Sequence, residues 1–298
     1  MKKREGNRRV HVYFHADDFG MTKETTDRIA YLCRQGIVDS LGILPNGCLR
    51  YALDQVRELP LLCAVHVNLV EGPALSSTGE RRLLTWGNGY MRHSFLGLLL
   101  LSVSPYRKQL YREVYEEIRC QLTAAREVWP ENWKIGLDSH QHVHMIPLIY
   151  RAMMDAARDL RIPVSYMRIP VEPIWPYVKE VSLWHTYSAV NAVKVFVLRV
   201  LWQFIRRDFS KRGIKRRLFF GLLFSGRMDG RRVFKLLPAF VRIAEKKGLD
   251  VEASFHPGYL RRGEPFLDPY KESFQKFYLS PGRKIEFETL KRMGRKAR

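Results

Sequence analysis

The chain has 298 residues, 46% of them hydrophobic, which is enough to bury a sizeable core, and we expect a single domain covering residues 1–298. Its 51 lysines and arginines against 30 aspartates and glutamates give a formal net charge of +21, which favours a polyanionic neighbour such as nucleic acid, anionic lipid head groups or a phosphorylated substrate. Four cysteines without a CxxC pair argue against a disulfide scaffold, so we expect core thiols in a reducing compartment.

Short apolar runs alternate with segments of helical periodicity along the chain. The predicted strands are 10–15, 38–44, 62–67, 134–137, 164–169 and 251–255, with a seventh at 214–220. The predicted helices are 23–35, 104–129, 147–160 and 231–247, and Pro238 should kink or divide the last of them. This alternation predicts an α/β fold with a mostly parallel sheet of about six or seven strands, closed or nearly closed into a barrel.

The predicted strands end in polar residues that can bind a metal or take part in catalysis. The residues at these strand ends are Asp17 and Asp18, Asn46, His66 and Asn68, Asp138 to His140, Arg168, and His256. Because the C-terminal ends of parallel strands meet on one face, where α/β barrels and open α/β sheets build active sites, the sequence predicts an enzyme.

Two adjacent carboxylates, Asp17 and Asp18, directly follow the first predicted strand. They cannot both point into the sheet, so we expect them in a loop, where one can bind a cation while the other remains free as a base. The structural alternative is an Asx turn that ends at Gly20.

Histidines follow in two further motifs. Alternation along the strand places His66 and Asn68 on one face, although a single strand histidine is more often a hydrogen-bonded core residue than a ligand. The segment from Asp138 to His144 holds three histidines in five residues, a density that is unusual for a solvated polar loop. One carboxylate and two imidazoles on neighbouring strand ends would hold a divalent cation with open positions for water and substrate.

These motifs resemble the YdjC-like carbohydrate deacetylases, a family that includes chitooligosaccharide deacetylase and the hopanoid-biosynthesis deacetylase-like proteins. The matching segments are ADDFG at 16–20, HVNLVEG at 66–72, DSHQHVHMIP at 138–147 and SFHPG at 254–258. The resemblance implies a distorted (β/α) barrel, a divalent metal (Mg²⁺ or Zn²⁺) on Asp18, His66 and His140, Asp17 as the base, and hydrolysis of an N-acetyl group from an amino sugar. His15 departs from the family pattern, which has asparagine two positions before the aspartate pair.

Other residues complete the predicted site. We expect His256 to be the acid that protonates the departing amine, because an imidazole can donate a proton at physiological pH; the alternative is a capping or core histidine. Arg168 could orient Asp17, bind a substrate oxygen or serve only as an ion-pair partner. His140 and His144 are spaced for one helix face, but the following Pro147 places the three histidines in a loop.

We therefore expect His144, like Asn68, to support the ligands or contact the substrate, and Asp138 to support a histidine rather than to bind the cation. Whether His142 or His144 is itself a ligand stays open at this point.

Basic residues gather in an amphipathic region at about 189–232, where they alternate with tryptophan and phenylalanine, and in a C-terminal tail at 283–298. This pattern suits an element at an anionic membrane surface, although an ordinary barrel helix with a solvated cationic face would also produce it. Phe95 to Val103 is interpreted as a substrate-covering lid, a membrane contact or a buried helical turn.

The N-terminal stub, Met1 to Arg9, lacks the apolar segment of a secretion signal, and no stretch reaches the roughly 18 apolar residues of a spanning helix. We expect a cytoplasmic protein, at most peripheral on the inner face of the cytoplasmic membrane.

The sequence thus predicts a metal-dependent N-deacetylase acting on an N-acetylhexosamine carried on a lipid, such as a polyprenyl phosphate or a hopanoid. Alternatives are a soluble chito-oligosaccharide deacetylase, and a metal-dependent phosphoesterase or glycosidase on the same barrel. A basic module that binds lipid or nucleic acid is the non-enzymatic alternative, and no nucleic-acid-binding motif supports the nucleic-acid form.

Overall fold

The computed structural model describes residues 9–76, 83–130 and 134–296. Seven strands form one sheet in which every neighbouring pair is parallel, in the order β5-β4-β3-β2-β1-β7-β6. The strands are β1 (Val12–Phe19), β2 (Ser40–Ile43), β3 (Leu62–Val67), β4 (Ile135–Ser139), β5 (Val164–Met167), β6 (Leu218–Phe220) and β7 (Val251–Phe255). The expected α/β class is confirmed, and so is the seventh strand, which the sequence places at 214–220.

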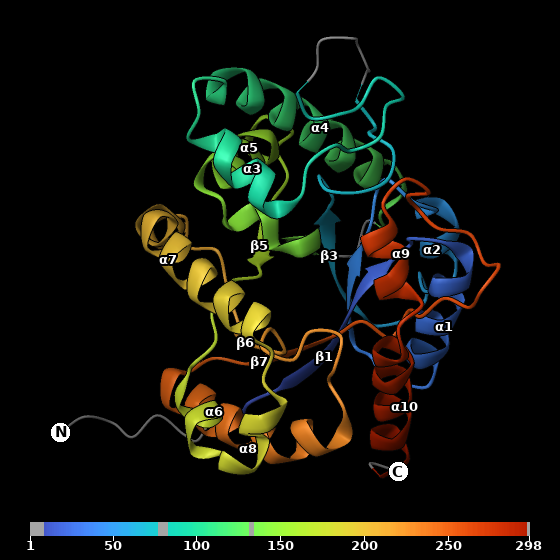
Figure 1. The fold of residues 1–298 in the computed structure, drawn as a ribbon, viewed down its shortest axis with the longest axis vertical. Helices are drawn as coiled ribbons and strands as arrows, with labels where there is room; N and C mark the ends of the chain where they lie inside the picture. Colours follow the sequence, from blue (N-terminus) through green and yellow to red (C-terminus); the bar gives the residue numbers. More distant parts are fainter. Residues whose placement is uncertain (1–8, 77–82, 131–133, 297–298) are drawn as a thin grey trace.

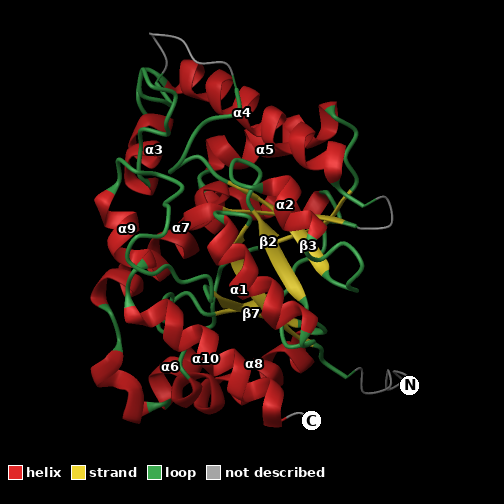
Figure 2. Ribbon diagram, turned by 90° about the vertical axis from the view of Figure 1, so that its right-hand side faces the viewer, coloured by secondary structure: helices red, strands yellow, loops and turns green. Residues whose placement is uncertain are grey.

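The sheet curls until its two edges nearly meet. Tyr166 in the edge strand β5 forms a parallel bridge with Lys215, and the Met167 N–H donates to the carbonyl of Lys215 at 3.0 Å. Lys215 lies three residues before the other edge strand, β6. The structure is therefore a distorted parallel barrel, and its strands remain in the centre with helices outside them (Figure 2).

Ten α-helices and two 3₁₀ segments surround the described part of the sheet (Figure 1). They are α1 (Lys23–Arg34), α2 (Leu49–Asp54), α3 (Phe95–Ser102), α4 (Arg107–Val128), η1 (His140–Met145), α5 (Pro147–Asp159), α6 (Trp175–Lys179), η2 (Val181–Thr186), α7 (Ala189–Lys211), α8 (Gly230–Lys247), α9 (Glu272–Tyr278) and α10 (Pro281–Lys296). The last two, red in Figure 1, lie beside α1 and α2 at the start of the chain, and Arg28 on α1 is ion-paired with Glu264 at 2.6 Å.

The helices form for local reasons that the sequence carries. Thr22 caps α1 by accepting a hydrogen bond from the Thr25 N–H, and Gly248 ends α8 in the left-handed conformation that glycine adopts without strain. Pro238 does not divide α8, which runs through it. Because Pro238 is exposed, the carbonyl that loses its helical donor lies near the solvent side, where water can replace the bond.

The barrel interior holds an ionic cluster in addition to aliphatic side chains. Arg168, fully buried, donates from Nε to Glu252 Oε1 at 2.6 Å, and Tyr166 donates its hydroxyl to the same carboxylate. Arg217 lies between the rings of Tyr13 and Tyr166, 3.9 and 4.1 Å from their centroids. Burial raises the pKa of Glu252 well above its usual range, and the charges of Asp138 and Asp17 raise it further. The chain therefore assembles buried charge at the centre of its sheet.

Several surface expectations are also resolved. Helix α3 buries Leu98, while Leu96 and Leu100 are 60% and 61% exposed, so the interpretation of 95–103 as a buried turn is wrong. All four cysteines are free; Cys33 and Cys63 are buried as expected of core thiols, whereas Cys48 and Cys120 are only half-buried. The ends of the chain, residues 1–8 and 297–298, lie outside the described residues, as do parts of the predicted N-terminal stub and basic tail.

Among the helices that the structure describes, none combines the length and the apolar character that crossing a membrane requires.

Candidate active site

Strand β1 delivers three polar side chains into the site. It runs to Phe19, so Asp17 and Asp18 belong to the strand and the expectation of a loop is wrong. The pairing of β1 with β2 shifts register between Ala16 and Phe19, and Asp18 has a positive φ of 64°. Such an irregularity re-aims a side chain, and aspartate tolerates the left-handed conformation better than most residues. The bulge thus lets two successive carboxylates both serve the site.

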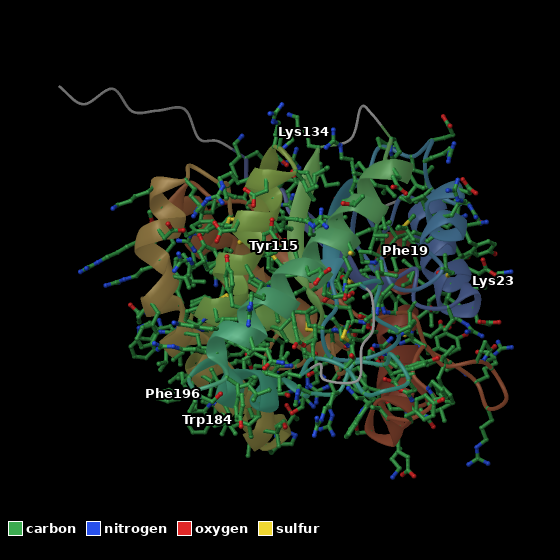
Figure 3. The ribbon with its side chains drawn as sticks, turned by 90° about the horizontal axis from the view of Figure 1, so that it is seen from above. Phe19, Lys23, Tyr115, Lys134, Trp184 and Phe196 are labelled. Carbon is green, nitrogen blue, oxygen red and sulfur yellow. The ribbon has the colours of Figure 1, made fainter. Side chains whose placement is uncertain are left out.

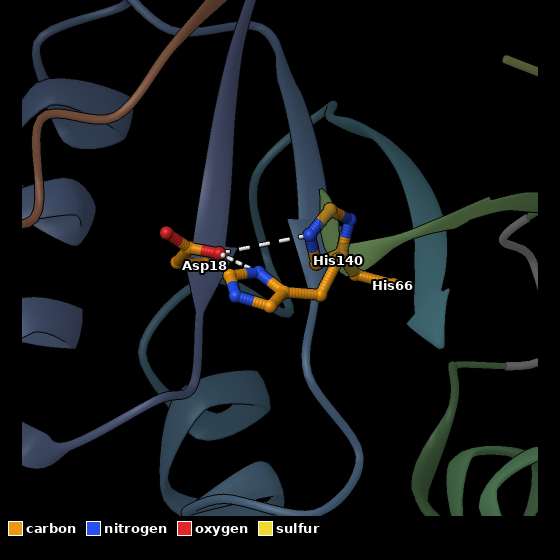
Figure 4. A group of neighbouring side chains, drawn as sticks. All are labelled: Asp18, His66 and His140. Atoms are coloured by element: carbon orange, nitrogen blue, oxygen red, sulfur yellow. Dashed lines mark hydrogen bonds and ion pairs between the residues drawn. The ribbon is translucent and has the colours of Figure 1, made fainter. Parts of the chain in front are cut away.

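Asp18, His66 and His140 converge from β1, β3 and the segment after β4 (Figure 4). The Asp18 Oδ1 atom lies 2.8 Å from His140 Nδ1 and 3.6 Å from His66 Nε2. All three side chains are buried, and one ligand atom from each lies within 4.8 Å of the others. These separations match the spacing of ligand atoms held about 2.0–2.2 Å from one shared ion, so the donor set fits a divalent metal.

A carboxylate orients each of the two imidazoles from its far side. His66 Nδ1 lies 2.8 Å from Asp138 Oδ1, which leaves Nε2 directed at Asp18. His140 Nε2 lies 2.9 Å from Glu71 Oε1, which leaves Nδ1 directed at Asp18. A carboxylate behind a metal-binding histidine fixes the ring and raises its basicity. Asp138 therefore lies behind His66, where its carboxylate would support this ring if His66 binds an ion.

When no ion is bound, protonated His66 and His140 supply the positive charge in the group of Asp18, His66 and His140. Burial lowers the pKa of His66, but the charge of Asp138 and its hydrogen bond outweigh burial and raise that pKa to about 10. Burial is likewise outweighed at His140, where the charges of Asp18 and Glu71 raise the pKa to about 9. Both rings are then imidazolium at neutral pH. A site that attracts protons this strongly is electrostatically suited to a cation.

A second group, His15, Asp17 and Asp138, is also close enough to share an ion. The positive charge beside this group comes from the Arg168 guanidinium. Arg168 binds Asp17 through Nη2 and Nη1 at 2.8 and 3.0 Å and approaches Asp138 Oδ2 at 3.1 Å. Because a guanidinium occupies the side where an ion would bind, the group around Asp18 is the better metal site.

Asp17 is held rigidly as a carboxylate beside the metal group. Besides Arg168, the Ser254 hydroxyl donates to its Oδ2 at 2.8 Å, and His15 Nε2 lies 3.1 Å from its Oδ1. Burial favours the neutral acid, but the charge of Arg168 and the hydrogen bond from His15 overcome it and hold the pKa of Asp17 well below its usual range. Arg168 therefore keeps Asp17 ionised and fixes the plane of its carboxylate.

His256 follows β7 and approaches Asp17 Oδ2, whereas His15 approaches Oδ1. Its Nε2 lies 3.6 Å from Asp17 Oδ2, and its side chain is 16% exposed, so solvent reaches it. Glu286 on α10 accepts the His256 backbone N–H and lies 3.7 Å from its Nδ1. The imidazole is thus held between two carboxylates, one in the site and one behind it.

The C-terminal helix supplies a further contact that sequence reasoning missed. Arg283, fully buried, donates from Nη2 to Asp18 Oδ2 and from Nη1 to the Gly258 carbonyl at 2.8 Å. The predicted basic tail begins at this residue, so for Arg283 a membrane-facing or solvated role is wrong. Its charge faces a buried carboxylate, which leaves Oδ1 as the Asp18 oxygen that points at the two histidines.

The remaining predicted residues lie around the group of Asp18, His66 and His140 and are not part of it. Asn68 accepts the N–H groups of Val70 and Glu71 on its Oδ1, at 3.1 and 3.2 Å, and so shapes the turn that presents Glu71. His144 is bound through both nitrogens, to the Ser139 hydroxyl at 2.6 Å and the Arg168 carbonyl at 2.8 Å. Burial lowers the pKa of His144 to about 4, so this ring is neutral.

His142 has a positive φ of 60°, and its ring makes a T-shaped contact with that of Phe219, with 5.6 Å between the ring centroids. Neither His142 nor His144 joins the Asp18 group. The sequence signal for Glu71 was present in the motif at 66–72, whereas Arg283 and Glu286 lie in a basic run whose pattern does not single them out.

Comparison with known proteins finds relatives that match parts of the chain. The chain is 29% identical over 167 residues to a protein from Oceanobacillus iheyensis named carbohydrate deacetylase, a match covering 53% of this chain and 65% of that protein. It is 29% identical over 155 residues to a Citrobacter koseri protein named chitooligosaccharide deacetylase, covering 51% of this chain and 58% of that protein. The chain thus matches less than two thirds of the length of these relatives.

A crystal structure of an Enterococcus faecalis protein, named for cellobiose-phosphate cleavage, shares the fold. It superposes with a TM-score of 0.59 at 18% identity and covers 96% of this chain and 95% of that one. The model of the YdjC-like protein family matches residues 11–293, which include every site residue described above. On that match, the chain belongs to the YdjC-like protein family.

Proposed function

We propose that this protein is a divalent-metal-dependent carbohydrate N-deacetylase that removes the acetyl group from an N-acetylhexosamine. The observation that carries the proposal is the convergence of Asp18, His66 and His140, with Asp17 and His256 beside them. The names of the relatives, carbohydrate deacetylase and chitooligosaccharide deacetylase, support the same reaction class.

Asp18 Oδ1, His66 Nε2 and His140 Nδ1 would hold the ion. A bound divalent ion supplies Lewis acidity, which polarises an amide carbonyl and acidifies water. Two imidazoles with one carboxylate favour zinc or another transition ion over magnesium, which prefers oxygen ligands. Asp138 and Glu71 keep the two rings in the orientation that binding requires.

The other residues move protons. Asp17 takes a proton from the water that attacks the acetamide carbon, and Arg168 with Ser254 holds its carboxylate in place for this step. His256, as imidazolium, gives its proton to the sugar nitrogen while the carbon–nitrogen bond breaks, and acetate and the free amine leave. Arg168 lowers the basicity of Asp17. What Arg168 contributes is therefore to keep the Asp17 carboxylate ionised and in position.

We further propose that the substrate is lipid-linked and that the protein works at an anionic membrane surface. Helix α7 supports this part, because Val190, Phe196 and Phe204 are 77%, 66% and 70% exposed on a helix that also carries basic residues. A soluble chito-oligosaccharide is the alternative substrate.

Acetate release tests the proposal. Purified protein would be incubated with alkyl N-acetylglucosaminides and chito-oligosaccharides, with EDTA and with added Zn²⁺ or Mg²⁺. We expect metal-dependent acetate release that Asp17→Asn abolishes and that the exposed control Asp54→Asn leaves unchanged. Folded, metal-loaded protein that releases no acetate from any of these substrates would overturn the proposal, and release of phosphate or a sugar would replace it with the corresponding hydrolase.

A further inference from the structure

An apolar groove lies between the α6–η2 segment and the first half of α7. Its volume is about 560 Å³, and its walls include Ile174, Val178, Trp184, Val195, Phe196 and Leu223. We call it the α6–α7 groove. Figure 3 shows Trp184 and Phe196 near each other at one edge of the molecule, seen from above. Trp184 and Phe196 are 52% and 66% exposed, so large apolar surfaces face solvent here.

Polar groups at the groove are largely bound within the protein. The buried Glu172 carboxylate accepts the N–H groups of Gly221, Leu222 and Leu223. Trp184 Nε1 donates to the carbonyls of Tyr177 and Val178, both at 3.2 Å. Two buried polar atoms of the lining residues, Tyr177 Oη and Arg199 Nε, have no hydrogen-bond partner in the described residues. They are too few to satisfy the N–H and C=O groups that a peptide would bring, whereas a hydrocarbon chain needs no such partners.

The groove is connected to the candidate active site through two elements. The loop that leaves β5 carries Arg168, which binds Asp17, and reaches the groove four residues later at Glu172. On α7, Val195 lines the groove, and the same helix packs against η1, the segment that carries His140.

Cationic side chains flank the groove. A second hollow of about 460 Å³ shares Ile174, Val178 and Arg199 with the groove, so the two hollows form one continuous depression. Two cationic side chains line this depression: Arg199, which is common to both hollows, and Lys247 in the second hollow. Arg199 donates from Nη2 to the Glu172 carbonyl at 2.5 Å. An apolar channel bordered by positive charge complements an amphiphile with an anionic or polar head.

We propose that the α6–α7 groove binds the hydrocarbon chain of a lipid-linked, N-acetylated amino sugar while its sugar occupies the site at Asp17 and Asp18. This inference rests on the proposed deacetylase function and specifies its substrate class. The groove would then select among substrates by their aglycone, and the sugar-binding residues would act on all of them alike.

Chain-length dependence tests the groove. N-acetyl-β-glucosaminides with methyl, octyl and dodecyl aglycones would be assayed for acetate release below their micelle-forming concentrations. Each fully buried methylene strengthens binding about fourfold, so burial of roughly three or four of the added methylenes should raise kcat/KM on the order of 100-fold from methyl to dodecyl. Phe196→Glu should remove most of that rise and leave the methyl glycoside unchanged.

The matched control is Phe204→Glu, on the same helix, with a side chain 70% exposed against 66% for Phe196, and outside the groove. It should retain the full chain-length dependence. Equal losses in the two variants would overturn the groove and point to general adsorption on α7. Equal rates for methyl and dodecyl glycosides would also overturn it, while deacetylation of both would leave the proposed function standing.

Binding supplies a readout that is independent of turnover. Calorimetric titration with dodecyl N-acetylglucosaminide should show binding by the wild type that Phe196→Glu weakens by tenfold or more, on the order expected for charge placed in an apolar channel. If no substrate is deacetylated, the proposed function fails and this titration still decides the groove. Unweakened binding in Phe196→Glu, or a dimer of the wild type that Phe196→Glu dissociates, would contradict a lipid chain as the occupant.

Discussion

Replacing His256 with alanine tests whether this imidazole protonates the departing amine. General acid catalysis contributes roughly 10²–10⁴-fold in rate. The His256 side chain is 16% exposed and lies 3.6 Å from Asp17 Oδ2, so in the variant water can enter and partly substitute for the imidazole. We therefore expect the lower part of that range for the amide, a loss of roughly 10²–10³-fold in kcat, or about 3–4 kcal/mol.

The assay compares two leaving groups. An N-acetylglucosaminide releases an amine that must be protonated as it departs, whereas p-nitrophenyl acetate releases a phenolate that leaves without a proton. His256→Ala should cost the amide its full factor and the ester about threefold or less. Glu286→Gln should also slow the amide more than the ester, with a smaller loss in kcat than His256→Ala. The reason is that Glu286 accepts the backbone N–H of His256 and lies 3.7 Å from His256 Nδ1.

Exposed His185, changed to alanine, is the control and should affect neither substrate. Equal losses for amide and ester would show that His256 acts before the bond to the leaving group breaks. No loss for either would remove it from the mechanism.

Further predictions concern the ion, acid stability and the buried arginine. Binding of Zn²⁺ to ion-free protein at pH 7.5 should release about two protons, seen as buffer-dependent calorimetric enthalpy, because His66 and His140, with pKa values of about 10 and 9, are protonated until the ion displaces their protons; enthalpy that is independent of the buffer would contradict this. Burial, and after it the charge of Arg168, lowers the pKa of His15 from 6.5 to about 4 in the folded protein. As the pH falls, the unfolded chain therefore binds this proton before the folded protein does, so the free energy of unfolding decreases between pH 6.5 and pH 4. Between pH 7.5 and pH 5, the free energy of unfolding measured with urea should therefore fall about 2 kcal/mol less in His15→Asn than in the wild type. The same fall in both proteins would count against a buried neutral His15. Arg168→Gln leaves buried carboxylates unpaired and should lower the free energy of unfolding by about 3–5 kcal/mol, against less than about 0.5 kcal/mol for the exposed control Arg57→Gln; similar values for the two variants would refute the ionic core.

The grouping of distant motifs in one site was predictable because one geometric rule connects them. Parallel strands bring their C-terminal ends to one face, so Asp18, His66 and His140 could be expected together although they are far apart in the chain. The residue types then limit the chemistry, since a carboxylate and two imidazoles are metal ligands.

The parts that could not be predicted depend on tertiary contacts alone. Arg283 lies in a basic segment that has the composition of a solvated tail, and only the packing of α10 against the site reveals that its charge faces Asp18. Glu252 is the charged residue of β7, and its partners Tyr166 and Arg168 come from β5 and the residue after β5, across the barrel. The bulge at Asp18 likewise follows from strand pairing, which local propensity does not encode.

Anomalous diffraction from zinc-loaded crystals directly tests whether Asp18, His66 and His140 bind one ion. We expect a strong peak at the zinc edge within about 2.0–2.2 Å of Asp18 Oδ1, His66 Nε2 and His140 Nδ1. A peak on the neighbouring group of His15, Asp17 and Asp138, or ordered zinc that lies away from Asp18, His66 and His140, would show that these three residues are not the metal site.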